Sequence, residues 1–237
     1  MGDTPKIRKV VLEEARVKGR RLGRHIEHDE RSRSFPADRA THIHAIDHNR
    51  HGVPLDQGSL GSCTGNAVAG ALNTEPVWQH GDPLANEDVA VKIYELATTL
   101  DAYDGSYPPD DTGSSGLAAC KAAKRLGLLT SYRHAFGIDH ALGALMLHPV
   151  ITGVNWYEGF DQPDASGRVE IAGNVRGGHE FEVVSFTPAT STLDGIVGAV
   201  NSWGLGYGKS GRFFFTARTW AQLLDEQGDV TVPYRKI

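Results

Sequence analysis

A single cysteine behind a glycine-punctuated loop is the feature of this sequence most able to do chemistry. The run QGSLGSC, residues 57–63, delivers Cys63 to the start of a small-residue apolar run, residues 63–72, which predicts a buried helix. A thiol at a helix amino terminus faces unpaired backbone N–H groups and the positive end of the helix dipole, which favour the thiolate. Because the thiolate is the nucleophilic form, the pattern predicts a nucleophile at Cys63.

A thiolate does not cleave an amide alone, because the leaving amine needs a proton and the developing oxyanion needs fixed donors. His179 directly follows Gly177-Gly178 and opens an apolar run, so we expect it at a strand end, as the general acid/base. Asn201 ends the next such run, where its side chain can fix one imidazole nitrogen. Gln57 lies six residues before the cysteine and can add a side-chain donor to the Cys63 N–H.

The elements that must position these residues fall into two sets. Three helices are predicted: one from Cys63 to about Thr74, one from the cap Asn86 to Leu100, and one from Ser114 or Ser115 to about Gly127. A weak strand pattern covers residues 42–47, and β-rich runs then follow at residues 149–156, 168–172, 179–186, 195–203 and 211–216. Helices followed by strands indicate an α+β fold with two lobes and a cleft between them.

Three sequence boxes, in this order, carry a family resemblance. QGSLGSC, GGHEFEVV and NSWGLGYGKSGRF resemble the cysteine, histidine and asparagine boxes of the papain-like cysteine peptidases, in a bacterial or phage-type variant without a long pro-region. The resemblance covers roughly residues 50–216. It implies a mainly helical lobe at about 41–145, an antiparallel β-barrel-like lobe at about 146–237, and an active-site cleft between the lobes.

The resemblance also implies a role for each matching residue. Cys63 would be the nucleophile, His179 its general acid/base, Asn201 the residue that orients the histidine, and Gln57 the oxyanion donor. Substrate-binding and supporting positions would be Ser115 and Gly116 within DTGSSGLAACKAAKRLGL, Gly178 beside the histidine, and Trp203, which would shield the histidine–asparagine hydrogen bond.

The implied activity is that of a thiol protease, a hydrolase that cleaves peptide bonds as an endopeptidase through a thioester on Cys63. No metal or organic cofactor is required. Two alternatives stay open: an acyl-transferase that passes the same acyl group to an amine, and a catalytically silent peptide-binding scaffold. We expect a monomer with a peptide or protein substrate and no need for nucleic acid.

Charge is distributed unevenly along the chain. The net charge of −5 divides into +4 over residues 1–50 and −9 over the remainder, so residues 1–40 form a basic arm before the peptidase domain at 41–237. Its mixed signs and lack of interleaved aromatic residues favour a solvated helix or docking arm over nucleic-acid contact. Residues 5–33 permit one short helix broken at Gly19 and Gly23. An arm this short leaves no room for a long inhibitory pro-region.

The second cysteine and the clustered histidines are expected to have structural or surface positions and no catalytic or metal-binding role. Cys120 lies among alanines and is expected to be buried and inert. Four histidines, His42, His44, His48 and His51, lack the spacing of a metal site, so surface or capping positions are expected. Composition is ordinary for a soluble protein, and two cysteines, no long apolar run and no signal sequence predict a cytoplasmic location.

Overall fold

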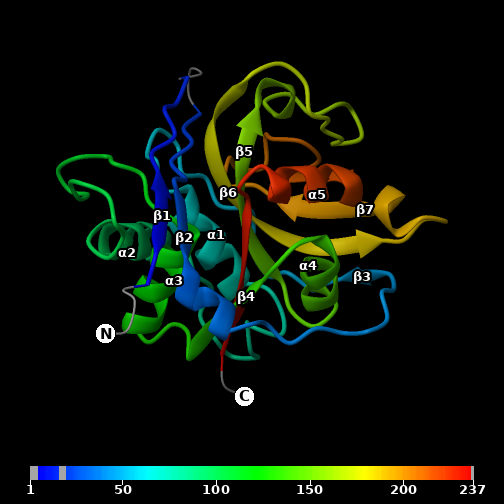
Figure 1. Ribbon diagram of the computed structural model, residues 1–237, viewed down its shortest axis with the longest axis horizontal. Helices are drawn as coiled ribbons and strands as arrows, with labels where there is room; N and C mark the ends of the chain where they lie inside the picture. Colours follow the sequence, from blue (N-terminus) through cyan, green and yellow to red (C-terminus); the bar gives the residue numbers. More distant parts are fainter. Residues whose placement is uncertain (1–4, 16–19, 236–237) are drawn as a thin grey trace.

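The computed structural model describes residues 5–15 and 20–235, which form two lobes (Figure 1). One lobe is built on three helices: α1 (Cys63–Leu72), α2 (Glu87–Thr98) and α3 (Gly116–Arg125). Their small and apolar side chains form one core cluster. All three predicted helices are therefore confirmed, and α1 is buried along its whole length.

The amino-terminal ends of these helices differ in a way that matters for the site. The Asn86 side chain caps α2 by accepting the Val89 N–H, and the Ser115 hydroxyl caps α3 by accepting the Ala118 N–H. The N-cap of α1, Ser62, makes no such side-chain bond. The first backbone N–H groups of α1 are thus left without a side-chain cap beside Cys63.

The other lobe is built on an antiparallel sheet in the order β4-β9-β5-β6-β7-β8, with β3 paired to β6. The sheet is open, since its end strands are β4 and β8, so the barrel-like part of the expectation is corrected. Its strands are β3 (Ile46–Asp47), β4 (Ser131–Ala135), β5 (Val150–Tyr157), β6 (Val175–Thr187), β7 (Ile196–Val200), β8 (Arg212–Thr216) and β9 (Asp229–Tyr234).

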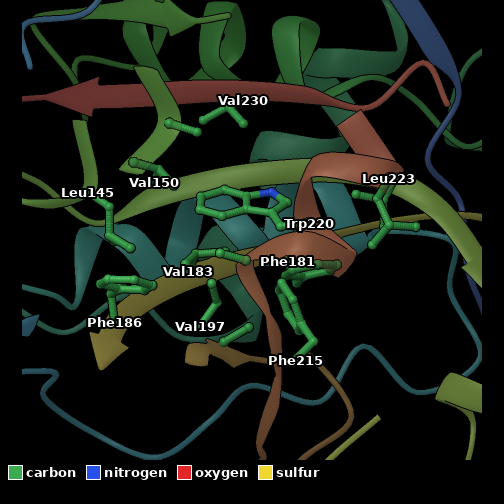
Figure 2. Close-up of a cluster of buried hydrophobic side chains, with 14 of the residues drawn as sticks. Leu145, Val150, Phe181, Val183, Phe186, Val197, Phe215, Trp220, Leu223 and Val230 are labelled. Carbon is green, nitrogen blue, oxygen red and sulfur yellow. The ribbon is translucent and has the colours of Figure 1, made fainter. Parts of the chain in front are cut away.

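Two helices, α4 (Ile138–Leu145) and α5 (Ala217–Asp225), pack against this sheet and fill its core. Figure 2 shows Trp220 of α5 among the side chains of the strands, including Phe181 and Val183. The Trp220 indole N–H also donates to the Thr152 hydroxyl. Short 3-10 turns occur at Glu30–Ser34, Glu158–Phe160 and Thr192–Asp194.

Four of the β-rich runs are strands, β5 to β8, but the run at 168–172 is not. Only Val169 of that run is buried, and glycines with positive φ, Gly167 and Gly173, turn the chain on both sides of it. The run makes a single bridge, from Arg168 to Phe214. The strand expected over 42–47 is reduced to the two residues of β3.

The amino-terminal arm differs most from expectation. Strand β1 (Ile7–Val10) pairs antiparallel with β2 (Ile26–Asp29) in a hairpin, and no α-helix forms over the described residues of 5–33. Leu22, Arg24 and Ile26 are almost completely buried. The arm is therefore not a solvated helix: residues 22–29 are largely buried, because tertiary partners there outweigh local helix propensity.

Two further findings concern the chain as a whole. No helix among residues 5–15 and 20–235 is long and apolar enough to cross a membrane. Cys120 is fully buried in α3, as its alanine-rich surroundings predict, and burial raises the pKa of its thiol.

Candidate active site

Cys63 is the first residue of α1 and is completely buried. Burial raises the pKa of its thiol far above the ordinary value, and the nearby Glu180 carboxylate acts in the same direction, whereas a hydrogen bond to the Glu180 backbone opposes the change. The expectation of a thiolate is thus wrong for this conformation. The penalty for burying a charge outweighs the helix dipole, which contributes at most about 2 kcal/mol.

His179 is the fifth residue of β6 and not at a strand end as expected, because Gly177 and Gly178 before it also pair with β5. Its imidazole is held by Asn201, which follows β7. Nε2 of His179 lies 2.7 Å from Oδ1 of Asn201. Because an amide oxygen only accepts, the bond places the proton on Nε2 and leaves Nδ1 as the basic nitrogen. This Nδ1 is buried and has no hydrogen-bond partner among the described residues. Burial lowers the pKa of His179 to about 3, so the imidazole is neutral here.

Two tryptophans enclose the histidine. The ring of Trp203 lies 4.9 Å from the His179 ring at an angle of 30°, and the ring of Trp156 lies 4.7 Å away at 75°. Trp203 is 6% exposed. These rings exclude water from the side of the imidazole that carries the asparagine bond, which strengthens the bond.

Gln57 is oriented by a residue that the sequence analysis did not single out. The Ser202 hydroxyl donates to Oε1 of Gln57 at 2.6 Å, and the Gln57 backbone N–H donates to the Ser202 carbonyl. With Oε1 so occupied, the Nε2 amide points toward other carbonyls: Leu60 at 2.8 Å, Arg21 at 3.1 Å and Leu22 at 3.4 Å. The only sequence signal for Ser202 is its place directly after Asn201.

Residues 20–25, here called the inter-lobe segment, lie between the two lobes beside these groups. On the sheet side, the Gly178 carbonyl accepts from the backbone N–H of Gly23 (3.2 Å) and of Arg24 (3.0 Å). On the same side the Trp203 indole donates to the Arg21 carbonyl at 3.2 Å.

On the helical side the segment pairs with Ser114. The Ser114 N–H donates to the Gly23 carbonyl at 2.8 Å, and the Ser114 carbonyl accepts from the His25 N–H at 2.7 Å. The two segments run parallel where Arg24 lies opposite Ser114. The inter-lobe segment is thus an extended peptide bound by backbone groups of both lobes.

The predicted substrate-binding positions lie close to the inter-lobe segment. Gly178 bonds the backbone of this segment on the sheet side, and Ser114 bonds it on the helical side. The Ser115 hydroxyl caps α3 and bonds the Glu27 carboxylate at 2.5 Å. Gly116 lies against Glu180, since a Cβ on this glycine would be 2.3 Å from Oε1.

The histidines of residues 42–51 take ordinary roles. His48 Nε2 bonds the Leu145 carbonyl, and His51 lies 2.8 Å from the Glu75 carboxylate. Among the described ranges, 5–15 and 20–235, no three histidine, cysteine or acidic side chains gather as metal ligands would.

Comparison with solved structures places this geometry in a known fold. Xylellain, a cysteine protease from Xylella fastidiosa, superposes with a TM-score of 0.72 at 18% identity, over 94% of this chain and 100% of its own. The chain has a papain-like fold. Digestive procathepsin L 3 of Tenebrio molitor has a TM-score of 0.62 at 13% identity, over 84% of this chain and 73% of its own.

Bromelain from Ananas comosus, in complex with the inhibitor E64, has a TM-score of 0.53 at 12% identity, over 78% of this chain and 94% of its own. No protein-family model and no curated protein sequence matches the chain. The papain-like fold is thus recognised through structure, and in the sequence only through the three short boxes.

Proposed function

We propose that this chain is a cysteine-dependent endopeptidase with Cys63 as nucleophile and His179 as general acid/base. The observation that carries the proposal is the extended peptide that the site already holds. The Gln57 amide, the Trp203 indole and the Gly178 carbonyl all bond the backbone of residues 21–24. A site with these groups beside a cysteine and an oriented histidine suits attack on a peptide carbonyl.

The proposed reaction has two stages. Nδ1 of His179 takes the Cys63 proton, and the thiolate attacks the scissile carbonyl carbon. The resulting oxyanion is held by the Gln57 amide and the Cys63 N–H, while Asn201 keeps the imidazole in the required tautomer. The imidazolium then protonates the leaving amine, and water activated by His179 hydrolyses the thioester.

The conformation described here is proposed to be a resting form. The inter-lobe segment occupies the place of a substrate backbone and keeps both reactive groups in their neutral states through burial. When the segment leaves, water returns to the site, and the thiolate–imidazolium pair becomes accessible. A short stretch, residues 20–25, is thus proposed to block the site.

The remaining assignments stay predictions. A reduced Cys63 is required, and the cytoplasmic location, expected from the two cysteines and the lack of a signal sequence or long apolar run, also stays a prediction. The division into an arm at 1–40 and a peptidase domain at 41–237, the monomeric state and the independence from nucleic acid are likewise proposed. Acyl transfer would be recognised by a new product that forms only when an amine acceptor is added.

The test is covalent labelling with a peptidyl epoxide, read by intact mass. It is best made in the full chain carrying Gly23→Val, because this change is expected to displace the inter-lobe segment. One label is expected, which is retained in Cys120→Ala, lost in Cys63→Ala and strongly slowed in His179→Ala. No label, or a label only on Cys120, would favour the silent scaffold.

A further inference from the structure

The side chain of Arg24 fills a pocket that the reaction itself does not require. Arg24 is completely buried, although arginine is among the residues least often found so. Its Nη2 lies 2.5 Å from Oδ2 of Asp229 and 2.8 Å from the Gln227 carbonyl. The inter-lobe segment therefore places a cation between the lobes, where α3, β5, β6 and β9 approach one another.

Two carboxylates face this cation. A Cβ on Gly153 would lie 2.5 Å from Oε2 of Glu180, 2.6 Å from Nε of Arg24 and 2.9 Å from Oδ2 of Asp229, so all three atoms surround one point. Glu180 is completely buried, and both of its carboxylate oxygens lack a hydrogen-bond partner among the described residues. Nε and Nη1 of Arg24 likewise have no hydrogen-bond partner there, so the pocket holds unsatisfied acceptors and unsatisfied donors together.

Glycines create the room for this arrangement. Any side chain at Gly153 would collide with Glu180, Arg24 and Asp229, and one at Gly116 would collide with Oε1 of Glu180 at 2.3 Å. A side chain long enough to reach Asp229 can enter only because Gly116 and Gly153, which line the pocket, have no side chains of their own. The pocket therefore suits a long, thin side chain with a charged end.

The energetics favour a positively charged occupant. Burying carboxylates without a cation is strongly unfavourable, and burial together with Asp229 raises the pKa of Glu180 whereas Arg24 lowers it. A guanidinium offers five donors in a planar fork and is less strongly hydrated than an ammonium, so arginine fits better than lysine. A neutral side chain would leave both acids unpaired.

We propose that the pocket formed by Gly116, Gly153, Glu180 and Asp229 selects an arginine side chain of the peptide substrate, for which Arg24 is the internal substitute. This inference rests on the proposed peptidase function. The backbone on each side of Arg24 bonds Ser114, through the Gly23 carbonyl and the His25 N–H. A substrate that replaces the segment finds the same Ser114 groups free, and the side chain it presents there enters the pocket.

The first test is a positional scan of fluorogenic peptides with the full-length Gly23→Val chain. At one position near the scissile bond, arginine is expected to exceed its neutral isostere citrulline on the order of 100-fold in kcat/KM. The preference should fall at least tenfold in Asp229→Asn. It should persist in Asp225→Asn, which alters an exposed acid at the end of α5. Cleavage without a preference for arginine would overturn the pocket assignment and leave the peptidase function standing.

The second test does not depend on catalysis. In the full chain with Arg24→Ala, propylguanidinium is expected to raise the melting temperature, whereas the isosteric, uncharged propylurea is not. Asp229→Asn in the same background should abolish the effect, and the native chain, whose pocket is filled, should not respond. Equal effects of the two compounds would overturn the proposal. A specific effect without any peptide cleavage would instead uphold the cation pocket and refute the peptidase function.

Discussion

Displacing the inter-lobe segment by a single substitution is the sharpest test of the resting form. Gly23 has φ +141°, and a Cβ on it would lie 2.1 Å from the Gly61 carbonyl oxygen, whereas real Cβ atoms essentially never approach another atom within 3.0 Å. Gly61 cannot easily retreat, since its N–H is held by both carboxylate oxygens of Asp111 at 3.0 and 3.1 Å. The segment itself must move.

Two contributions determine how much Gly23→Val destabilises the closed position of the inter-lobe segment. Overpacking of a filled site typically costs about 1–3 kcal/mol, and a side chain in an unfavourable φ region costs a similar amount. A combined destabilisation of about 3 kcal/mol raises the open population about 100-fold, because 1.4 kcal/mol corresponds to a factor of ten. Gly23→Val should therefore increase both peptide hydrolysis and the rate of Cys63 alkylation on the order of 100-fold over the native chain.

The matched control is Gly81→Val. Gly81 also has positive φ, +93°, but a Cβ there would meet no atom within 4 Å. The assay is initial-rate hydrolysis of a fluorogenic peptide, with folding checked by circular dichroism. A folded Gly23→Val chain that is as slow as the native one, or activation of equal size by Gly81→Val, would refute the blocking role of the segment.

Three further predictions concern the reactive groups. First, His179 has a pKa of about 3 when buried, below its unfolded value of about 6.5, so the unfolded state binds more protons between these values. The free energy of unfolding of the native chain should fall as pH drops from about 6.5 toward 3, by up to about 1.4 kcal/mol per pH unit for this group. Denaturant titrations at several pH values measure this fall. It should be smaller in His179→Gln and unchanged in the exposed-site control His80→Gln. Second, in the Gly23→Val background, Asn201→Ala should lower kcat about 10- to 100-fold, less than Cys63→Ala or His179→Ala; equal and total losses in folded variants would contradict the division of roles. Third, Ser202→Ala should lower kcat about tenfold with little change in KM, because the Gln57 amide loses the bond that orients it, and Ser202→Thr should recover most of the rate. A rise in KM alone would mean that Ser202 serves substrate binding instead.

The sequence by itself determined the helices of the first lobe and most strands of the second. Caps and periodicity are local signals, so Asn86, Ser115 and the alanines of residues 118–123 are informative without tertiary context. The candidate catalytic residues were also identifiable, because Cys63, His179 and Asn201 stand in short boxes at the ends of apolar runs. The strand predicted over residues 168–172 does not form: its apolar residues alternate as in a strand, but the run makes only one bridge, from Arg168 to Phe214.

Only the tertiary structure decided the state of the site and the function of the arm. Propensity along residues 5–33 permits a helix, yet backbone groups of Ser114 and Gly178, far apart in sequence, hold residues 23–25 extended between the lobes. The same packing reverses the expected ionisation of Cys63, because burial depends on what covers the thiol and not on its place in the helix. The acidic pocket likewise arises only where Glu180 and Asp229, from different strands, meet above Gly153. Such long-range encounters leave no periodic trace in the sequence, so only the folded chain reveals them.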